Sequence, residues 1–335
     1  MKLSFFFQLL LAIFVFVSCE KSPKPQIYEG NALGTTFSMQ FFHSDELMLS
    51  SSIDSTFTVL NQSLSTYIST SDISKINDGD TTIEVDNQFV TNFETAKRIY
   101  QETDAYFDPS VGILVNAYGF GPRKYNININ DEKVIDSLMQ FVGFDKFQIN
   151  SSNTLEFPNG AFLDFNAIAK GYAVDRLGVL LEQNNIEDFL IEVGGELVGK
   201  GFNQANGNTW RIGVEDPDSP VDDRSFSHIV ELNGYGMATS GNYRKFSVDD
   251  QGNRFVHTIN PKTGKSEKTD VISATVIANT CMEADAYATA FMAMGAEKSR
   301  EFLQKYTNVH ALLYVAVGDE IQLQISDGFQ AFIVD

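Results

Sequence analysis

Cysteine is scarce in this 335-residue sequence, which contains two, Cys19 and Cys281. A small disulfide-rich scaffold is therefore excluded, because such scaffolds depend on many cysteines. A zinc cluster is excluded as well, since two cysteines and four scattered histidines do not give the required ligand spacing. The chain must therefore be stabilised by a hydrophobic core, and it is long enough to bury one.

Basic residues are also in short supply. The chain has 24 Lys and Arg against 44 Asp and Glu, a formal net charge of −20. Such a surface repels nucleic acid and anionic lipid, so neither is an expected partner. A ligand that carries phosphate would need specific cations within its site.

The common nucleotide and hydrolase motifs are missing. The sequence contains no G-x-x-x-x-G-K-[ST] loop and no G-x-G-x-x-G after a strand, so neither a P-loop nor a Rossmann site is supported. It also lacks H-E-x-x-H and G-x-S-x-G, the motifs of zinc proteases and of serine hydrolases.

Only one long apolar run occurs, and it lies at the start of the sequence. Residues 3–17 follow Lys2 and are too short to span a bilayer comfortably, which is typical of a signal peptide. The run ends in Phe16-Val17-Ser18-Cys19, which resembles a bacterial lipobox, although Phe16 stands where Leu is usual. An ordinary signal peptide with a chance cysteine is the alternative.

The lipobox interpretation divides the chain into three parts. We expect a signal peptide over residues 1–18, a lipid-anchored tether over 19–29 and one catalytic domain over 30–335. If Cys19 carries the lipid, Cys281 has no partner for a disulfide within the chain. The protein would then be exported and held at a membrane, facing the periplasm.

Short strands and helices alternate without a linker, a repeat or a break in composition. Periodicity predicts helices over residues 54–64, 92–102, 131–141, 166–183, 282–294 and 298–306. It predicts strands over 37–42, 189–193, 196–199, 210–215, 227–232, 254–259, 271–278, 311–317 and 320–325. We also expect a hairpin of 154–157 with 161–165, and Asn166 as the cap of the helix that follows. Many hairpin-like strands with a few helices favour an α+β fold with antiparallel or mixed sheets and flanking helices.

A predicted helix carries a candidate metal site. Asp285 and Thr289 are four residues apart and therefore share one helix face, with alanines beside them. A carboxylate and a hydroxyl are hard oxygen ligands suited to Mg²⁺. The alternative is an ordinary acidic residue near a helix N-terminus, where the helix dipole favours it.

A second segment, residues 163–175, runs from a strand end into a helix N-terminus. Free backbone N–H groups at such a position favour anions, and Lys170 in the first turn would add a charge for a phosphate. A lysine on a solvated helix face is the alternative.

Aromatic residues and glycines mark two further segments. Tyr106 and Phe107, with the turn and glycines after them, can hold a flat ring system or pack as an ordinary loop. Gly194-Gly195 allows a ligand to approach the backbone closely, or only makes a turn. His257, before a turn at 260–264, is a candidate proton carrier near neutral pH, although lone histidines are often structural.

Taken together and in this order, these segments resemble the ApbE family of FAD:protein FMN transferases. The collinear matches are Gly34-Thr35-Thr36, a segment over 65–77, Phe107 to Gly112, Asp164 to Asp175, Gly194-Gly195, Thr239 to Tyr243, His257 to Gly264 and Asp285 to Thr289. They extend from about residue 30 to residue 295, which is most of the chain.

The resemblance implies that FAD lies in a cleft with its pyrophosphate near Mg²⁺, and that FAD is a substrate. It implies that the metal is held by Ala167, Asp285, Ala288 and Thr289, and that His257 is the catalytic base. The positions that contact FAD would be Leu33, Tyr67, Tyr106, Phe107, Asp108, Asp164, Lys170, Gly194, Gly195 and Ile259. Lys170 departs from some members, which carry an acid there.

The family's reaction places FMN on a threonine or serine hydroxyl of a target flavoprotein and releases AMP. An FAD pyrophosphatase would use the same site with water as nucleophile. A flavin-binding lipoprotein without catalysis, or a purely structural protein, would require neither His257 nor the Asp285 and Thr289 pair.

Overall fold

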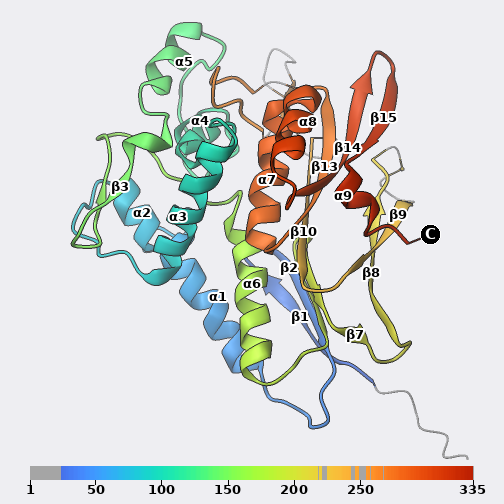
Figure 1. Ribbon diagram of the computed structural model, residues 1–335. Helices are drawn as coiled ribbons and strands as arrows, with labels where there is room; N and C mark the ends of the chain where they lie inside the picture. Colours follow the sequence, from blue (N-terminus) through green and yellow to red (C-terminus); the bar gives the residue numbers. More distant parts are fainter. Residues whose placement is uncertain are drawn as a thin grey trace, which may run out of the picture.

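An eight-stranded antiparallel sheet forms the centre of the molecule (Figure 1). The computed structural model describes residues 24–217, 219–220, 225–242, 246–248, 254–256, 258–266 and 268–334. From one edge to the other the strands are β1 (Gln26–Ala32), β2 (Thr35–Phe41), β5 (Phe189–Val193), β6 (Glu196–Lys200), β10 (Tyr235–Gly241), β13 (Val271–Ala278), β14 (His310–Val317) and β15 (Glu320–Ile325).

Side-chain alternation explains the outer strands of this sheet. In β2, Phe37, Met39 and Phe41 point into the core while their neighbours are more exposed. The central strand β13 differs, since seven of its eight residues are buried. Such a strand is expected where both faces of a sheet are covered.

A smaller sheet covers one face of the large one. Its strands are β7 (Phe202–Asn203), β8 (Asn208–Glu215) and β9 (Phe226–Leu232). Apolar side chains of both sheets form a shared cluster that includes Val214, Val230, Leu197 and Met237. Two short two-stranded sheets pair β3 (Gln148–Ile149) with β4 (Leu155–Glu156) and β11 (Phe246–Val248) with β12 (Arg254–Val256).

Helices cover the opposite face of the large sheet, where α6 and α7 lie against its central strands (Figure 1). The helices are α1 (Ser50–Leu64), α2 (Asp72–Asn77), α3 (Asn87–Glu102), α4 (Gly112–Ala117), α5 (Glu132–Met139), α6 (Ala169–Gln183), α7 (Cys281–Met294), α8 (Ala296–Lys305) and α9 (Asp327–Gln330). Helix α9 is the exception, because its Phe329 packs with the smaller sheet on the other face. Short 3₁₀ turns occur at Pro109–Val111 and Phe144–Lys146. Helix α7 is apolar on nearly all sides because it packs between the sheet and helices α3, α6 and α8.

The α+β prediction is confirmed, and most predicted elements lie within a few residues of the observed ones. The hairpin of 154–157 with 161–165 is wrong. Strand β4 pairs instead with β3, which precedes it, and residues 161–165 form no strand. The predicted cap is also wrong, since Ile168 precedes α6 and the Asn166 amide donates to Thr66 Oγ1 at 3.1 Å.

Several expectations fall on residues outside the described ranges, namely the signal peptide over 1–18, the lipid on Cys19, the first part of the tether over 19–23 and the base His257. The expected end of the tether at residue 29 is wrong, because residues 26–29 already pair with β2 as part of β1. Among the residues that are described, no helix is long and apolar enough to cross a membrane.

Candidate functional site

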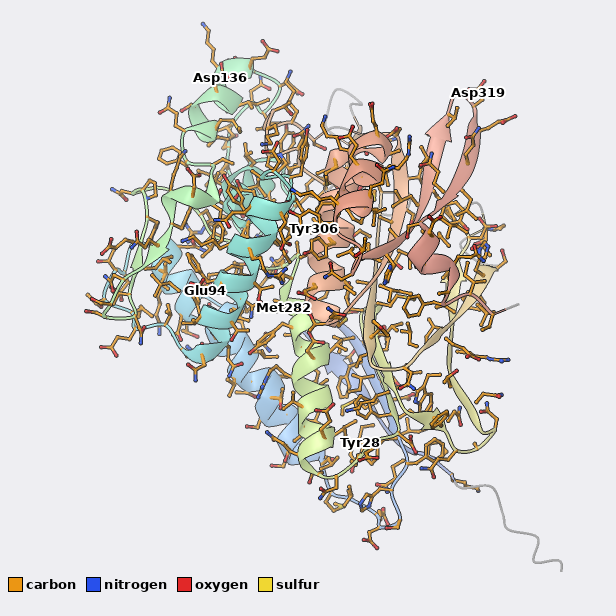
Figure 2. All side chains as sticks on the ribbon, in the orientation of Figure 1. Tyr28, Glu94, Asp136, Met282, Tyr306 and Asp319 are labelled. Atoms are coloured by element: carbon orange, nitrogen blue, oxygen red, sulfur yellow. The ribbon has the colours of Figure 1, made fainter. Side chains whose placement is uncertain are left out.

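The N-terminal ends of α6 and α7 meet at unusually close range. A Cβ on Gly171 would lie 2.3 Å from the carbonyl oxygen of Cys281, so only glycine permits this approach. Asp175, one turn further along α6, accepts hydrogen bonds from the N–H groups of Cys281 and Met282, each at 2.9 Å. Figure 2 labels Met282 at this junction. The carboxylate thereby satisfies backbone donors that the start of α7 would otherwise leave open.

Asp285 of α7 faces the first turn of α6 across this junction. Its side chain is buried, and one carboxylate oxygen accepts the N–H of Gly171 at 3.1 Å. The other lies 3.8 Å from Lys170 Nζ, which in turn donates to Glu196 at 2.6 Å. The structure thus brings the predicted residues Lys170 and Asp285 together and adds a second carboxylate.

Burial and charge oppose each other in this cluster. Burial raises the pKa of Glu196 to about 7, and the Lys170 ammonium opposes that rise. Burial raises the pKa of Asp285 as well, against the effects of Lys170 and the Gly171 N–H. For Lys170, burial lowers the pKa, but the two carboxylates outweigh it and raise the pKa above its ordinary value. The ammonium therefore stays charged between its partners.

Thr289 lies one turn after Asp285 and is only partly buried, unlike most of α7. Its Oγ1 is 3.5 Å from Ser240 Oγ on β10. No three His, Cys, Asp or Glu side chains gather into a metal-binding group in the described part of the chain. The expected magnesium site is of another kind, with one carboxylate, one hydroxyl and the backbone carbonyls of Ala167 and Ala288. A buried carboxylate beside a partly open hydroxyl fits a hard cation.

Asp164 lies on a loop that two distant contacts hold in place. The side chain of Asn77 donates to the carbonyl of Leu163 and accepts its N–H, each at 2.8 Å. The N–H of Asp164 donates to the Pro109 carbonyl at 2.9 Å, and its carboxylate accepts the N–H of Asn166 at 2.7 Å. Burial raises the pKa of Asp164.

Two other positions predicted to contact FAD are Tyr67 and Ile259, and they differ in exposure. Tyr67 is 63% exposed, and its hydroxyl donates to the Phe120 carbonyl at 3.4 Å. Partial burial of the phenol and the charge of the Asp164 carboxylate both raise the pKa of Tyr67. Ile259 is buried in an apolar cluster with Leu114 and Phe162. Phe162 directly precedes Leu163 in the sequence, so this cluster lies next to the Asp164 loop.

The three residues from Tyr106 to Asp108 have different environments. Lys262 Nζ lies 5.5 Å from the centre of the Tyr106 ring, whereas Phe107 is buried in the main core. The Asp108 carboxylate accepts both the N–H and the hydroxyl of Ser110. Burial raises the pKa of Asp108 to about 6, and the bonds from Ser110 limit the rise.

Two tight turns meet at the end of the sheet that carries Glu196. Leu33 and Gly34 connect β1 to β2 with positive φ angles, and Gly194 and Gly195 connect β5 to β6 in the same way. A Cβ on Gly194 would lie 2.7 Å from a side-chain atom of Thr35, so the two turns are in contact. The structure therefore brings the predicted positions Leu33, Gly194 and Gly195 together.

Sequence reasoning missed several polar residues that shape this region. Asn77 and Asp175 end two of the matched segments but received no role, and Glu196 received none although it directly follows the Gly194-Gly195 pair. Their partners lie 26 to 107 residues away, and no local pattern shows such pairs.

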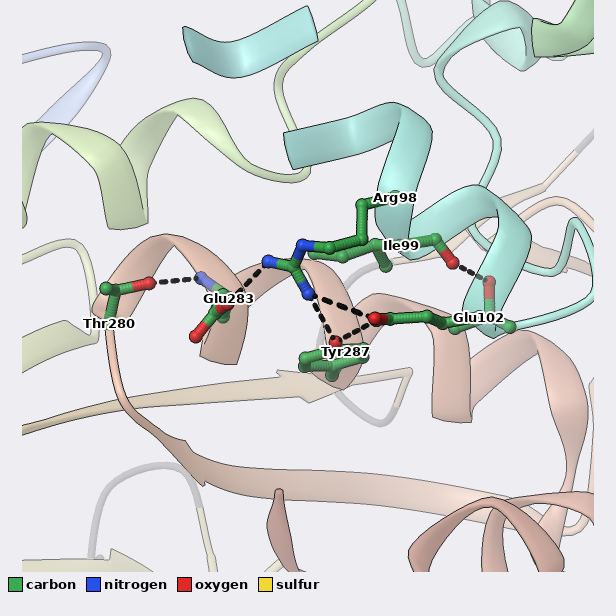
Figure 3. A network of polar contacts seen from close by, with 7 residues as sticks. Arg98, Ile99, Glu102, Thr280, Glu283 and Tyr287 are labelled. Atoms are coloured by element: carbon green, nitrogen blue, oxygen red, sulfur yellow. Dashed lines mark hydrogen bonds and ion pairs between the residues drawn. The ribbon is translucent and has the colours of Figure 1, made fainter. Parts of the chain in front are cut away.

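A further network joins α3 to α7 (Figure 3). Arg98 donates to Glu283 at 2.5 Å and to Glu102 at 3.1 Å, and the Tyr287 hydroxyl also donates to Glu102. It fixes the outer side of the helix that carries Asp285 and Thr289.

Known proteins resemble this chain over most of its length. The sequence model of the ApbE family matches residues 33–313. A FAD:protein FMN transferase of Vibrio cholerae is 31% identical, with 97% of each chain covered, and that of Escherichia coli K12 is 30% identical, with 97% of this chain and 96% of the relative covered.

Solved structures agree with this relationship. The flavin transferase ApbE from Vibrio cholerae superposes with a TM-score of 0.82 at 30% identity, covering 92% of this chain and 99% of the other. The apo flavinyl transferase ApbE of Pseudomonas stutzeri gives a TM-score of 0.82 at 27% identity, covering 92% and 97%. The residues assembled around α6 and α7 all fall within the matched range, and the chain belongs to the ApbE family.

Proposed function

We propose that this protein is a flavin transferase that cleaves FAD and attaches the FMN half to a hydroxyl of a target flavoprotein. The observation that carries the proposal is the meeting of α6 and α7, where the buried Asp285 carboxylate lies 3.8 Å from Lys170 Nζ and Thr289 follows Asp285 one turn later on α7. Relatives of similar length named FAD:protein FMN transferase support the same activity.

The reaction balances without an oxidant or reductant. The acceptor oxygen forms a bond to the phosphorus on the FMN side of the pyrophosphate. The bond from that phosphorus to the bridging oxygen breaks, and AMP leaves with the bridging oxygen. The hydroxyl proton passes to a base, since a neutral hydroxyl is a poor nucleophile near pH 7.

Mg²⁺ is the proposed metal, held by Asp285, Thr289 and the carbonyls of Ala167 and Ala288. When bound, it would neutralise charge on the pyrophosphate and on the leaving phosphate. Lys170, at the N-terminal turn of α6, would add a positive charge on the same side. Asp164, Tyr67, Leu33, Gly194-Gly195 and Ile259 would contact the rest of FAD.

His257 is the proposed base, and the acceptor residue is proposed to be threonine or serine. Export and attachment to a membrane through lipid on Cys19 are parts of the same proposal. The residues between Cys19 and β1, which begins at Gln26, would act as the tether that leaves the catalytic domain free to meet its acceptor on the periplasmic side.

An acceptor domain with a single candidate threonine, incubated with the purified chain, FAD and Mg²⁺, tests the proposal by mass spectrometry. We expect the threonine to gain the mass of one FMN less one water, which equals FAD minus the released AMP. This gain should be absent with EDTA and absent with Asp285→Ala. Glu182→Ala is the matched control, because it removes a carboxylate from the exposed far end of α6 and should leave transfer unchanged.

Two outcomes would contradict the proposed transferase activity. Free FMN and AMP without a mass gain, for several acceptors, would indicate a pyrophosphatase. Intact FAD under all conditions would indicate a protein that only binds flavin.

A further inference from the structure

Glu196 is a buried acidic residue that the proposed reaction does not use. It is the first residue of β6, directly after the Gly194-Gly195 turn, and 5% of its surface is exposed. One carboxylate oxygen accepts from Lys170 Nζ at 2.6 Å. The other is buried and has no hydrogen-bond partner among the described residues. A carboxylate that is costly to bury in this way calls for an explanation.

The distances from Lys170 Nζ to the carboxylates of Glu196 and Asp285 explain why Glu196 is buried there. Its ammonium makes a direct hydrogen bond with Glu196, but it stays 3.8 Å from Asp285, beyond hydrogen-bond length. Lys170 is therefore drawn towards β6 and away from the carboxylate on α7. Asp285 keeps one oxygen for Gly171 and one that Lys170 does not fully occupy.

We propose that Glu196 is a positioning residue that holds Lys170 away from Asp285 and so keeps the Asp285 carboxylate available for a divalent cation. The inference rests on the proposed metal role of Asp285. It assigns to Glu196 an effect on metal affinity through Lys170, without a bond from Glu196 to the metal.

The net charge of Glu196, Asp285 and Lys170 predicts how each substitution changes the affinity for a cation. With both carboxylates and the ammonium charged, the three side chains carry one net negative charge. Glu196→Gln removes that charge and also frees Lys170 to pair directly with Asp285, so a cation meets both competition and a less negative site. Lys170→Met combined with Glu196→Gln restores the single negative charge and removes the competitor.

The experiment is a titration of the full chain, purified in detergent, with Mn²⁺ alone, in which electron paramagnetic resonance measures the free ion. We expect Glu196→Gln to weaken Mn²⁺ binding at least tenfold, and the double variant to return to within about threefold of the unchanged protein. Glu182→Gln, which removes a carboxylate on the same helix as Lys170 from its exposed pair with Lys200 of β6, should leave the affinity unchanged.

The outcomes separate this inference from the proposed function. Normal affinity in Glu196→Gln, or a double variant as weak as the single one, would overturn the positioning role; the second result would make Glu196 a direct ligand. If Glu196→Gln does not fold, Lys170→Met alone decides, because the inference requires it to bind Mn²⁺ at least as tightly as the unchanged protein. No Mn²⁺ binding by the unchanged protein would overturn both the metal site and the inference.

Discussion

Asn77 connects the stability of this protein to the shape of its site. It is the last residue of α2, and its side chain makes both of its hydrogen bonds to the backbone of Leu163, 86 residues away. Leu163 is fully buried, and Asp164 follows it directly. Replacing Asn77 by Leu keeps the approximate size of the side chain but leaves an N–H and a C=O buried without partners.

The magnitude follows from these two groups. A buried polar group that loses its partner costs about 1–3 kcal/mol. Asn77→Leu should therefore lower the free energy of unfolding by about 2–6 kcal/mol. Because Asp164 moves with Leu163, FAD affinity should fall as well, even at temperatures where the variant is fully folded.

Urea unfolding provides the measurement. Trp210 is the only tryptophan and is buried in β8, so its fluorescence reports the loss of the folded sheet. Asn150→Leu is the matched control, since Asn150 makes similar bonds within a partly exposed loop that water can reach. Its loss should be below about 1 kcal/mol.

The reasoning would be refuted if Asn77→Leu and Asn150→Leu had equal effects on stability. A large loss of stability with unchanged FAD affinity would be informative in a different way. It would show that the two hydrogen bonds between Asn77 and Leu163 support the fold but do not position Asp164.

Three other predictions concern separate parts of the site. His257→Ala should leave FAD binding intact, measured by flavin fluorescence, and slow the transfer step in a single turnover; unchanged transfer would remove the base assignment. The folded-state pKa of Asp108, about 6, lies above its unfolded value, so its contribution to stability is present at low pH. That contribution falls by about 3 kcal/mol between about pH 4 and 6. In urea unfolding measured across this pH range, Asp108→Asn should remove this pH dependence. Gly171→Ala should lower the melting temperature and metal affinity together, because its Cβ would meet the Cys281 carbonyl at 2.3 Å, whereas Gly178→Ala on the same helix, with its nearest contact at 3.8 Å, should not.

Periodicity was enough to predict the long elements. Strand 320–325 was placed at both ends, and the strand over 271–278 likewise. Helix α1 begins four residues before its predicted start, since Leu49 gives no side-chain cap and three serines conceal the first turn. The hairpin predicted over 154–165 rests on a turn signal at Pro158 to Gly160, which does form a hydrogen-bonded turn but is followed by no strand.

The site could be predicted by residue type but not by partner. Asp285, Lys170 and Asp164 were identified from local patterns and from a family resemblance. The residues that hold them are Glu196, Asp175 and Asn77, and each acts across the fold. Their contribution depends on the order of strands in the sheet and on two helix N-termini meeting, which a single sequence does not reveal.

The junction of α6 and α7 also encloses a thiol. Cys281 is the one free cysteine among the described residues; it is fully buried, and burial raises its pKa well above the ordinary value. A thiol that is both protonated and enclosed reacts slowly with oxidants and alkylating agents. The Cys281 sulfur lies 3.6 Å from the Met237 carbonyl of β10, and its N–H is bound by Asp175 of α6. Exposure of Cys281 therefore requires the start of α7 to move away from the sheet and from α6. The rate of its alkylation measures how often this movement occurs, and a ligand that bridges α6 and α7 should slow that rate without touching the sulfur.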